Sequence, residues 1–226
     1  MAATESKLWY LEQINLFKNL TEQEMKKIDE QSVMHAADKN QFIYFPEEPS
    51  KVIYFLKRGR VKIGSYSEDG KEILKTILYP GEVFGEMGII GESKRKDFAI
   101  AIDKDTRLCT LSVEGMKGIM NSNPALSLGV TTLIGEKLRK MELKLESVIF
   151  KDARTRIIDL IKEMGKDYGQ RVGEETLIKH NLTHQDIANL TATSRQTVTT
   201  VLNELKEMNL VYMERNRFLL RDLNAL

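Results

Sequence analysis

The sequence contains very little cysteine, histidine and tryptophan. Its 226 residues include one Cys, Cys109, together with three His and one Trp. A single cysteine cannot form a disulfide within the chain, and it cannot supply the several thiolates that hold an iron–sulfur cluster. The sequence therefore predicts a protein of a reducing compartment, without an iron–sulfur cluster and without a cysteine-rich metal site.

Long apolar runs and a large charge imbalance are also missing. No run approaches the ~18 residues of a membrane span, and the first residues lack the basic-then-apolar pattern of a secretion signal. We therefore expect a cytoplasmic protein with no membrane partner. Lys and Arg total 34 against 33 Asp and Glu, so bulk charge neither indicates nor excludes a nucleic-acid partner, and any basic patch must be local.

The motifs of common enzyme classes are absent as well. The sequence has no nucleophile motif, phosphate-binding loop or metal-ligand cluster. The glycines Gly81, Gly85 and Gly88 follow a turn within a strand-rich region, whereas a dinucleotide site needs a strand that leads into a helix. We therefore predict no catalytic residues, no metal site and no enzymatic activity.

The first part of the chain, residues 1–123, has the pattern of a β-sandwich after a short helical opening. Thr21 and Glu24 are spaced as a helix-capping box. From about Val33 to Leu111, short apolar runs alternate with turn residues, as in an antiparallel roll. The segment "SEDGKE" places Asp69-Gly70 between two such runs, which is a strong hairpin signal. These features predict a β-roll, or jelly roll.

Residues 124–150 have few helix breakers and predict one long helix. Apolar or small residues recur along it at alternating steps of three and four, which is typical of a coiled-coil seam. This pattern predicts a dimerisation helix, although the same stripe could instead be covered by the chain's own β-domain. The seam residues are Thr131, Ile134, Leu138, Met141, Leu145 and Val148.

Residues 151–226 predict a winged helix-turn-helix, so the expected fold class is α+β. The stretches "ARTRIIDLIKEM", "THQDIANLTA" and "TSRQTVTTVLNELKE" have helical periodicity, and the last residues form a hairpin pattern around Arg215 and Asn216. Helix, turn, helix and β-wing form a motif whose second helix enters the major groove of double-stranded DNA.

The predicted second helix carries side chains suited to base edges. Ile187, Leu190, Val198, Val201 and Leu202 would lock the two helices together and leave the Arg195 face outward. Arg195 suits guanine and Gln196 suits adenine, and the methyl groups of Thr199 and Thr200 suit thymine.

A further set of residues is placed to meet the DNA backbone. On the two helix starts these are Thr183, His184, Gln185, Ser194 and Thr197, and on the wing they are Arg215 and Arg217. An alternative for one base contact stays open, because Thr193 and Gln196 are also spaced as a capping box, in which Gln196 would bond its own backbone.

Two long motifs now point to a known family. The β-roll segment "PGEVFGEMGII", the long helix and "LTHQDIANLTATSRQTVTTVLNELKEMNLV" resemble the cyclic-AMP receptor protein/FNR family of bacterial transcription regulators. The resemblance implies a homodimer that binds an inverted repeat, RNA polymerase as a further partner, and an effector site in the β-roll. It would place that site at Gly85, Glu86, Met87, Lys96, Asp97, Met141 and Glu142.

The expected effector site departs from the nucleotide-binding pattern of the family. Gly85-Glu86 matches the pair that meets the ribose, but Lys96 and Asp97 stand where an Arg-Ser pair grips the cyclic phosphate. Met141 and Glu142 replace the Thr-Ser pair that reaches the adenine. A carboxylate beside the phosphate position adds repulsion, so we expect an effector other than cyclic AMP, or none.

Two alternatives complete the sequence-based expectations. Haem sensing is left open, although His35, His180 and His184 form no convincing ligand pair. A cyclic-nucleotide-dependent signalling module that acts through protein partners is the second functional hypothesis. Intact Arg-Ser phosphate chemistry would favour that module, and it is missing.

Overall fold

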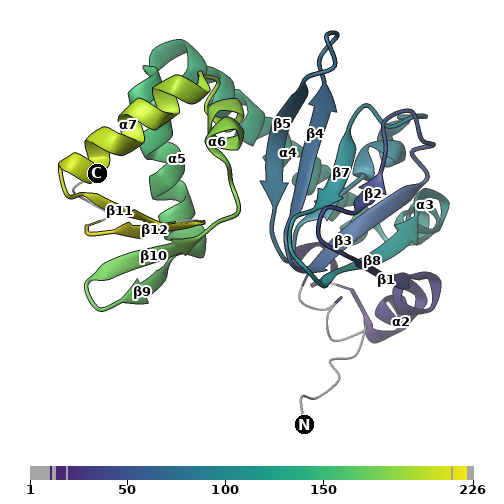
Figure 1. The fold of residues 1–226 in the computed structure, drawn as a ribbon. Coiled ribbons are helices and arrows are strands. Elements are labelled where there is room, and N and C mark those ends of the chain that lie inside the picture. Colours follow the sequence, from purple (N-terminus) through teal and green to yellow (C-terminus); the bar gives the residue numbers. More distant parts are fainter. Residues whose placement is uncertain (1–10, 12–13, 19, 215, 223–226) are drawn as a thin grey trace. The chain divides into compact units, whose positions relative to one another are not determined.

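The computed structural model describes residues 11, 14–18, 20–214 and 216–222 (Figure 1). Contacts within the chain divide it into two compact units, residues 1–138 and 139–226. Each unit has buried apolar residues of its own. Among the described residues, no helix is both long and apolar enough to cross a membrane.

The first unit is built on two four-stranded antiparallel sheets. The strand orders are β1-β8-β3-β6 and β2-β7-β4-β5. Apolar residues from both sheets, among them Tyr44, Leu56 and Phe84, share one buried cluster, so the predicted β-roll is confirmed. The strands are β1 Val33–Ala37, β2 Phe42–Tyr44, β3 Val52–Arg58, β4 Val61–Tyr66, β5 Glu72–Leu78, β6 Val83–Phe84, β7 Phe98–Ala101 and β8 Thr106–Ser112.

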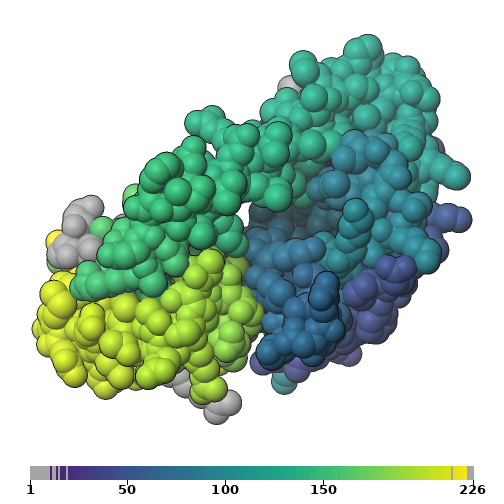
Figure 2. All heavy atoms as spheres, turned by 90° about the horizontal axis from the view of Figure 1, so that it is seen from above, coloured from purple at the N-terminus to yellow at the C-terminus, as the bar shows by residue number. Residues whose placement is uncertain are grey.

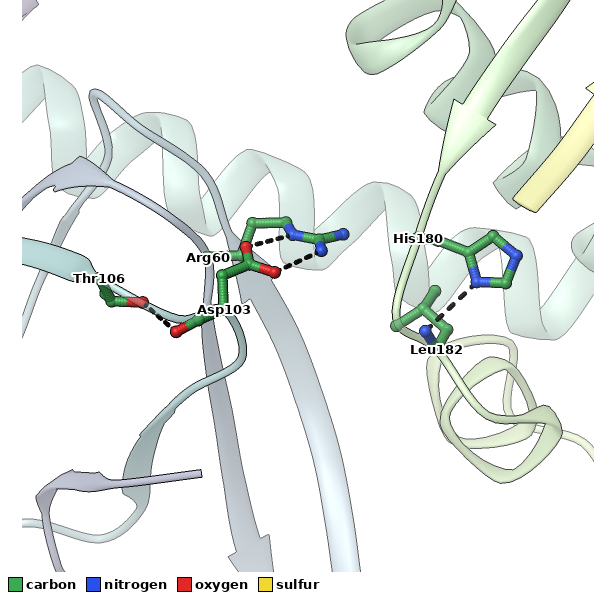
Figure 3. A network of polar contacts seen from close by, with 5 residues as sticks. All are labelled: Arg60, Asp103, Thr106, His180 and Leu182. Atoms are coloured by element: carbon green, nitrogen blue, oxygen red, sulfur yellow. Dashed lines mark hydrogen bonds and ion pairs between the residues drawn. The ribbon is translucent and has the colours of Figure 1, made fainter. Parts of the chain in front are cut away.

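Local turn chemistry fixes the connections of the roll. Strands β4 and β5 form the predicted hairpin, and Gly70 in its turn has φ of 75°, a conformation that favours glycine. At another connection, the Arg60 guanidinium donates two hydrogen bonds, of 2.8 and 2.7 Å, to the carboxylate of Asp103 (Figure 3). The Thr106 hydroxyl donates to the Asp103 carbonyl at 3.0 Å, so this loop is held on both sides.

Short helices cover a second buried cluster of the first unit. They are η1 Asn15–Phe17, α2 Glu22–Gln31, η2 Glu86–Ile90 and α3 Val113–Ser122. The capping box predicted from Thr21 and Glu24 is present at the start of α2. Phe17 and Met116 are buried with Phe55 of β3, so the helices complete the core on that side of the roll.

Helix α4 spans Pro124–Phe150 and extends from the first unit into the second. Near its start, Leu126 and Val130 are buried in the core of the first unit, and Ile134 is half-buried against the same core. The later seam residues are exposed, with Leu138 at 57% and Met141 at 68% of their full exposure. The chain's own β-domain therefore covers only the first part of the apolar stripe.

The second unit combines three shorter helices with a four-stranded sheet of order β11-β12-β10-β9. In the space-filling view the green residues of α5 lie against the yellow carboxy-terminal elements (Figure 2). The elements are α5 Ala153–Tyr168, β9 Gln170–Val172, β10 Glu175–Lys179, α6 His184–Leu190, α7 Arg195–Glu207, β11 Val211–Glu214 and β12 Arg217–Leu220.

Sequence patterns predicted the helices and the β11–β12 hairpin of this unit but missed β9 and β10. All three residues of β9 are exposed, so this strand has no apolar alternation to reveal it. Strand β10 pairs with β12, about forty residues further on in the chain, through four residue pairs. This long-range pairing makes β10 a central strand, and local periodicity cannot detect it.

Candidate nucleic-acid interface and effector site

The turn between α6 and α7 is held from inside the second unit. Ile187 of α6 and Val198 and Leu202 of α7 are fully buried where the two helices pack. Arg156 of α5 donates to the carbonyls of Thr191 and Ala192 at 2.8 and 3.1 Å. The guanidinium therefore satisfies carbonyl groups at the end of α6 that have no partner within the helix.

Ser194 caps the start of α7. Its Oγ accepts a hydrogen bond from the Thr197 amide at 3.0 Å, and the two hydroxyls lie 2.8 Å apart. The alternative box between Thr193 and Gln196 is therefore wrong, because the cap lies one residue later. Gln196 is exposed, so its amide remains available for a partner outside the chain.

The outer face of α7 carries exposed polar side chains. Arg195, Gln196 and Thr200 are exposed, whereas Thr199 is half-buried. The Thr199 hydroxyl donates to the Arg195 carbonyl at 3.0 Å and lies 2.9 Å from Nδ1 of His184. The hydroxyl of Thr199 is thus committed within the unit, which leaves its methyl group for any base contact.

The start of α6 faces the start of α7 across an open hollow lined by Thr183, His184, Gln185 and Arg195. Thr183 caps α6 in a box with Asp186. The side-chain amide of Gln185 donates to the side-chain oxygen of Asn189, one helical turn further on, at 3.1 Å. The structure therefore brings Arg195 together with the three predicted backbone-contacting residues of α6.

His180 links the wing hairpin to the segment that leads into α6. The His180 amide donates to the Asn216 carbonyl at 2.9 Å, and its Nδ1 accepts from the Leu182 amide at 3.2 Å (Figure 3). Its ring lies 4.1 Å from that of Phe218. Arg217 is exposed on β12, and Arg215 lies outside the described residues.

In the first unit, Gly85 and Glu86 form the tight turn between β6 and η2. Gly85 has φ of 75°, and a Cβ atom there would lie 2.9 Å from the backbone oxygen of Val52, so any larger residue would be strained at this position. Glu86 is buried, and Lys137 of α4 donates to its Oε1 at 2.8 Å and to the Val83 carbonyl at 2.7 Å. The charge of Glu86 is therefore balanced within the unit.

Sequence reasoning missed Arg95, which is the cation that points into the roll. Its side chain donates to the carbonyls of Gly85 and Val52, and its guanidinium lies 4.5 Å from the centre of the Tyr44 ring. Only 2% of Arg95 is exposed, and its Nε has no hydrogen-bond partner among the described residues. The neighbouring Lys96 is exposed.

The sequence offers three adjacent cations, Lys94, Arg95 and Lys96, as candidates for this inward position. The sequence does carry one signal that distinguishes Arg95 from the two lysines. Arginine is better suited than lysine to stack on aromatic rings and to bond several acceptors when buried. The sequence-based expectation named the neighbouring Lys96 instead of Arg95.

The remaining residues expected at the effector site are Asp97, Met87, Met141 and Glu142. Asp97 accepts a hydrogen bond from the Tyr44 hydroxyl at 3.1 Å and lies 3.7 Å from Lys75. Burial, and then the nearby charge of Asp97, raise the pKa of Tyr44, so this phenol stays protonated as a donor. Met87 is exposed, and so are Met141 and Glu142 in the second unit.

The described residues contain no group of three His, Cys, Asp or Glu side chains that could hold a metal ion. His35 lies on β1 in the first unit, where its Nε2 is 3.1 Å from the Thr110 hydroxyl. His180 and His184 lie in the second unit and have the local roles described above.

Comparisons with known proteins match both units. Residues 34–123 match the model of a cyclic nucleotide-binding domain, and residues 155–226 match that of a Crp-like helix-turn-helix domain. The chain is 26% identical to a global nitrogen regulator of Nostoc sp. over 82% of this chain and 83% of that protein. It is 27% identical to a "CRP-like cAMP-activated global transcriptional regulator" of Mycobacterium tuberculosis over 80% of each.

Solved structures share the fold. A mutant of CooA from Carboxydothermus hydrogenoformans aligns with a TM-score of 0.73 and 25% identity, over 94% of this chain and 93% of that one. FixK2 from Bradyrhizobium japonicum aligns with a TM-score of 0.75 and 19% identity, over 86% and 94%.

Proposed function

The chain belongs to the cyclic-AMP receptor protein/FNR family of transcription regulators, and we propose that it binds an inverted-repeat operator as a homodimer. The observation that carries this proposal is the start of α7. Arg195 is exposed there beside Gln196, on a helix whose opposite face is fully buried. A helix presented in this way can place its first residues against base edges in the major groove.

The proposed DNA contacts fall into two groups, one to base edges and one to the sugar-phosphate backbone. Arg195 would form a bidentate pair with guanine, while Gln196 and Thr200 would contact neighbouring bases. Thr183, His184, Gln185, Ser194, Thr197 and the wing residue Arg217 would hold the sugar-phosphate backbone. Arg215 retains the same proposed role from sequence alone.

The exposed half of α4 supports the homodimer. Leu138, Met141, Leu145 and Val148 are all exposed in the single chain, and their spacing matches a coiled-coil seam. A second copy of the same helix would cover this stripe through a two-fold axis. Such a dimer would present two α7 helices to two half-sites.

Any effector of the proposed regulator is a molecule other than cyclic AMP. Glu86 is already paired with Lys137, and Arg95 already bonds two carbonyls. An anionic ligand would therefore have to replace those bonds beside the negative charge of Asp97. Replacing satisfied bonds in this way costs binding free energy.

The expected location of the protein and its further protein partner follow from its proposed role as a regulator. A regulator that binds operators would act in the bacterial cytoplasm and would contact RNA polymerase there. The proposal contains no catalytic step, because the proposed role of the chain is to hold DNA and to respond to a signal in the β-roll.

The test is selection of bound duplexes from random DNA with the purified full chain. The proposal expects an enriched inverted repeat for the natural chain, and for Arg195→Ala a weaker enrichment with the preference relaxed at one base pair of each half-site. Repeating the selection with metabolites from a cell extract shows whether an effector is needed. A natural chain that enriches no sequence under either condition contradicts the proposal.

A titration with cyclic AMP tests the effector. Calorimetry on the natural chain should show no binding tighter than about millimolar, the weak end of the affinity scale. A micromolar constant that is lost in Arg95→Gln would instead identify Arg95 as a phosphate-binding residue and overturn this part of the proposal.

A further inference from the structure

His184 and Thr199 form a hydrogen-bonded chain that ends on the backbone of α7. Nδ1 of His184 lies 2.9 Å from Oγ1 of Thr199, and that oxygen lies 3.0 Å from the carbonyl oxygen of Arg195. The hydroxyl has one proton, and a carbonyl can only accept. The positions of the hydrogens in this chain are therefore restricted.

Only one arrangement makes both contacts hydrogen bonds. If Thr199 donates to the Arg195 carbonyl, then Nδ1 of His184 must carry a hydrogen and donate to Thr199. If Thr199 instead donates to Nδ1, its contact with the carbonyl is lost. The neutral imidazole is thus held with its hydrogen on Nδ1, and its Nε2 carries a lone pair.

The second ring nitrogen, Nε2, is not used by this hydrogen-bonded chain. His184 lines the open hollow with Thr183, Gln185 and Arg195, and its Nε2 has no hydrogen-bond partner among the described residues. In the neutral ring, this lone pair would repel a phosphate oxygen. After protonation, the same atom becomes a charged donor.

We propose that His184 takes up a proton when the chain binds DNA, so that each half-site is held by an imidazolium–phosphate contact. This inference rests on the proposed DNA-binding function. The negative charge of the phosphate favours the protonated ring in the complex. The added affinity is therefore present at low pH and is lost as the pH rises and the bound ring gives up its proton.

The charged groups around His184 agree with a contact that needs an anionic partner. Arg195 on α7 shares the hollow and disfavours a second positive charge until DNA is present. The Asp186 carboxylate on α6 accepts from the amide and hydroxyl of Thr183. Arg156 of α5 is directed at the carbonyls of the following turn.

The first experiment measures the affinity for a selected operator from about pH 6 to about pH 8.5 at constant ionic strength, the range in which a histidine can change its charge. For the natural chain, the dissociation constant should rise by up to about tenfold per pH unit for each subunit that takes up a proton. His184→Gln should abolish this dependence, because an amide donates at every pH. His184→Arg should bind tightly and equally across the range.

The control is His35→Gln, since His35 also faces a threonine hydroxyl but lies on β1 of the first unit. This variant should retain the full pH dependence. A pH dependence that persists in His184→Gln would overturn the proposal, whereas operator binding without any sequence preference would instead contradict the proposed function.

A second experiment reads the hydrogen position directly in the free protein. Nitrogen NMR of the imidazole at about pH 8.5, where a histidine is neutral, should show hydrogen on Nδ1 in the natural chain. Thr199→Val removes the acceptor and should shift the population toward hydrogen on Nε2. A natural chain with its hydrogen on Nε2 would refute the inference even if the affinity varied with pH.

Discussion

At the residue scale, the exposed arginines of the second unit have different surroundings. Arg195 begins α7 beside a hollow of polar side chains, whereas Arg217 is exposed on the wing strand β12. A guanidinium at the start of the helix that enters the major groove can pair with a base, and one on a wing meets the phosphate backbone. The two residues should therefore fail differently when they are truncated.

Arg195→Ala should cost about 1–3 kcal/mol per half-site and relax the preference at one base pair. Arg217→Ala should weaken all sequences alike and reduce the slope of log affinity against log salt by about one per subunit. Binding to single-base operator variants at several salt concentrations separates the two effects. If Arg195→Ala kept the base preference, α7 would only position the protein.

At the element scale, the two parts of α4 have different surroundings. Its first part is buried in the unit that contains the β-roll, and its later part exposes a stripe of apolar residues. The same type of residue therefore has different roles at Leu126 and at Leu145, although both lie on one continuous helix.

Leu126→Ala should lower the free energy of unfolding by about 2–5 kcal/mol, because it leaves a cavity in a packed core. Leu145→Ala should change the stability of the monomer by less than about 0.5 kcal/mol but weaken the dimer. Denaturant unfolding at low protein concentration, together with sedimentation, measures both quantities. Equal losses of monomer stability in the two variants would contradict this division.

Helix α5 depends on a charged cap. Asp152 accepts from the Thr155 amide at 2.7 Å, and this bond holds the pKa of Asp152 below its ordinary value. A lowered pKa in the folded state means that the stabilisation is present above the unfolded-state pKa and is lost as the pH falls through the lower folded-state value.

Asp152→Asn provides the matched comparison, since Asn caps helices well but carries no charge. The natural chain should have the higher melting temperature at neutral pH, and the difference should shrink below about pH 4, near the ordinary range of aspartate. Melting curves between about pH 3 and pH 7 test this. A difference that stays constant with pH would remove the charge from the explanation.

At the scale of the whole molecule, the proposed operator geometry requires two chains. Two recognition helices related by a two-fold axis meet half-sites about one helical turn apart, ~10–11 base pairs from centre to centre. Binding two half-sites at once raises the affinity far above that of one, because the second contact forms within the same complex.

The double variant Leu138→Glu with Met141→Glu should be monomeric, because it places charges in the proposed seam, and it should lose tight operator binding. Sedimentation and operator affinity measure the two consequences. Glu142→Gln, on the same helix but outside the seam, is the control and should remain dimeric. A double variant that sediments as an unchanged dimer would exclude this seam.

Local chemistry was enough to predict much of the molecule. Helix α7, the Asp69-Gly70 hairpin and the capping box at Thr21 follow from periodicity and turn chemistry over a few neighbouring residues. The sequence motifs on α6 and α7 likewise indicate the family without any information on tertiary contacts. These features depend on residues that are close together in the sequence.

Tertiary structure alone decided which of the neighbouring side chains enter the interior. It turned Arg95 inward rather than Lys96. It paired Glu86 with Lys137, which lies 51 residues away in the sequence. It also added β10 to the wing sheet. It also covered the first part of α4 and left the rest exposed. Each outcome depends on which distant segment lies opposite, and one-dimensional patterns carry no information on the register or facing of distant segments.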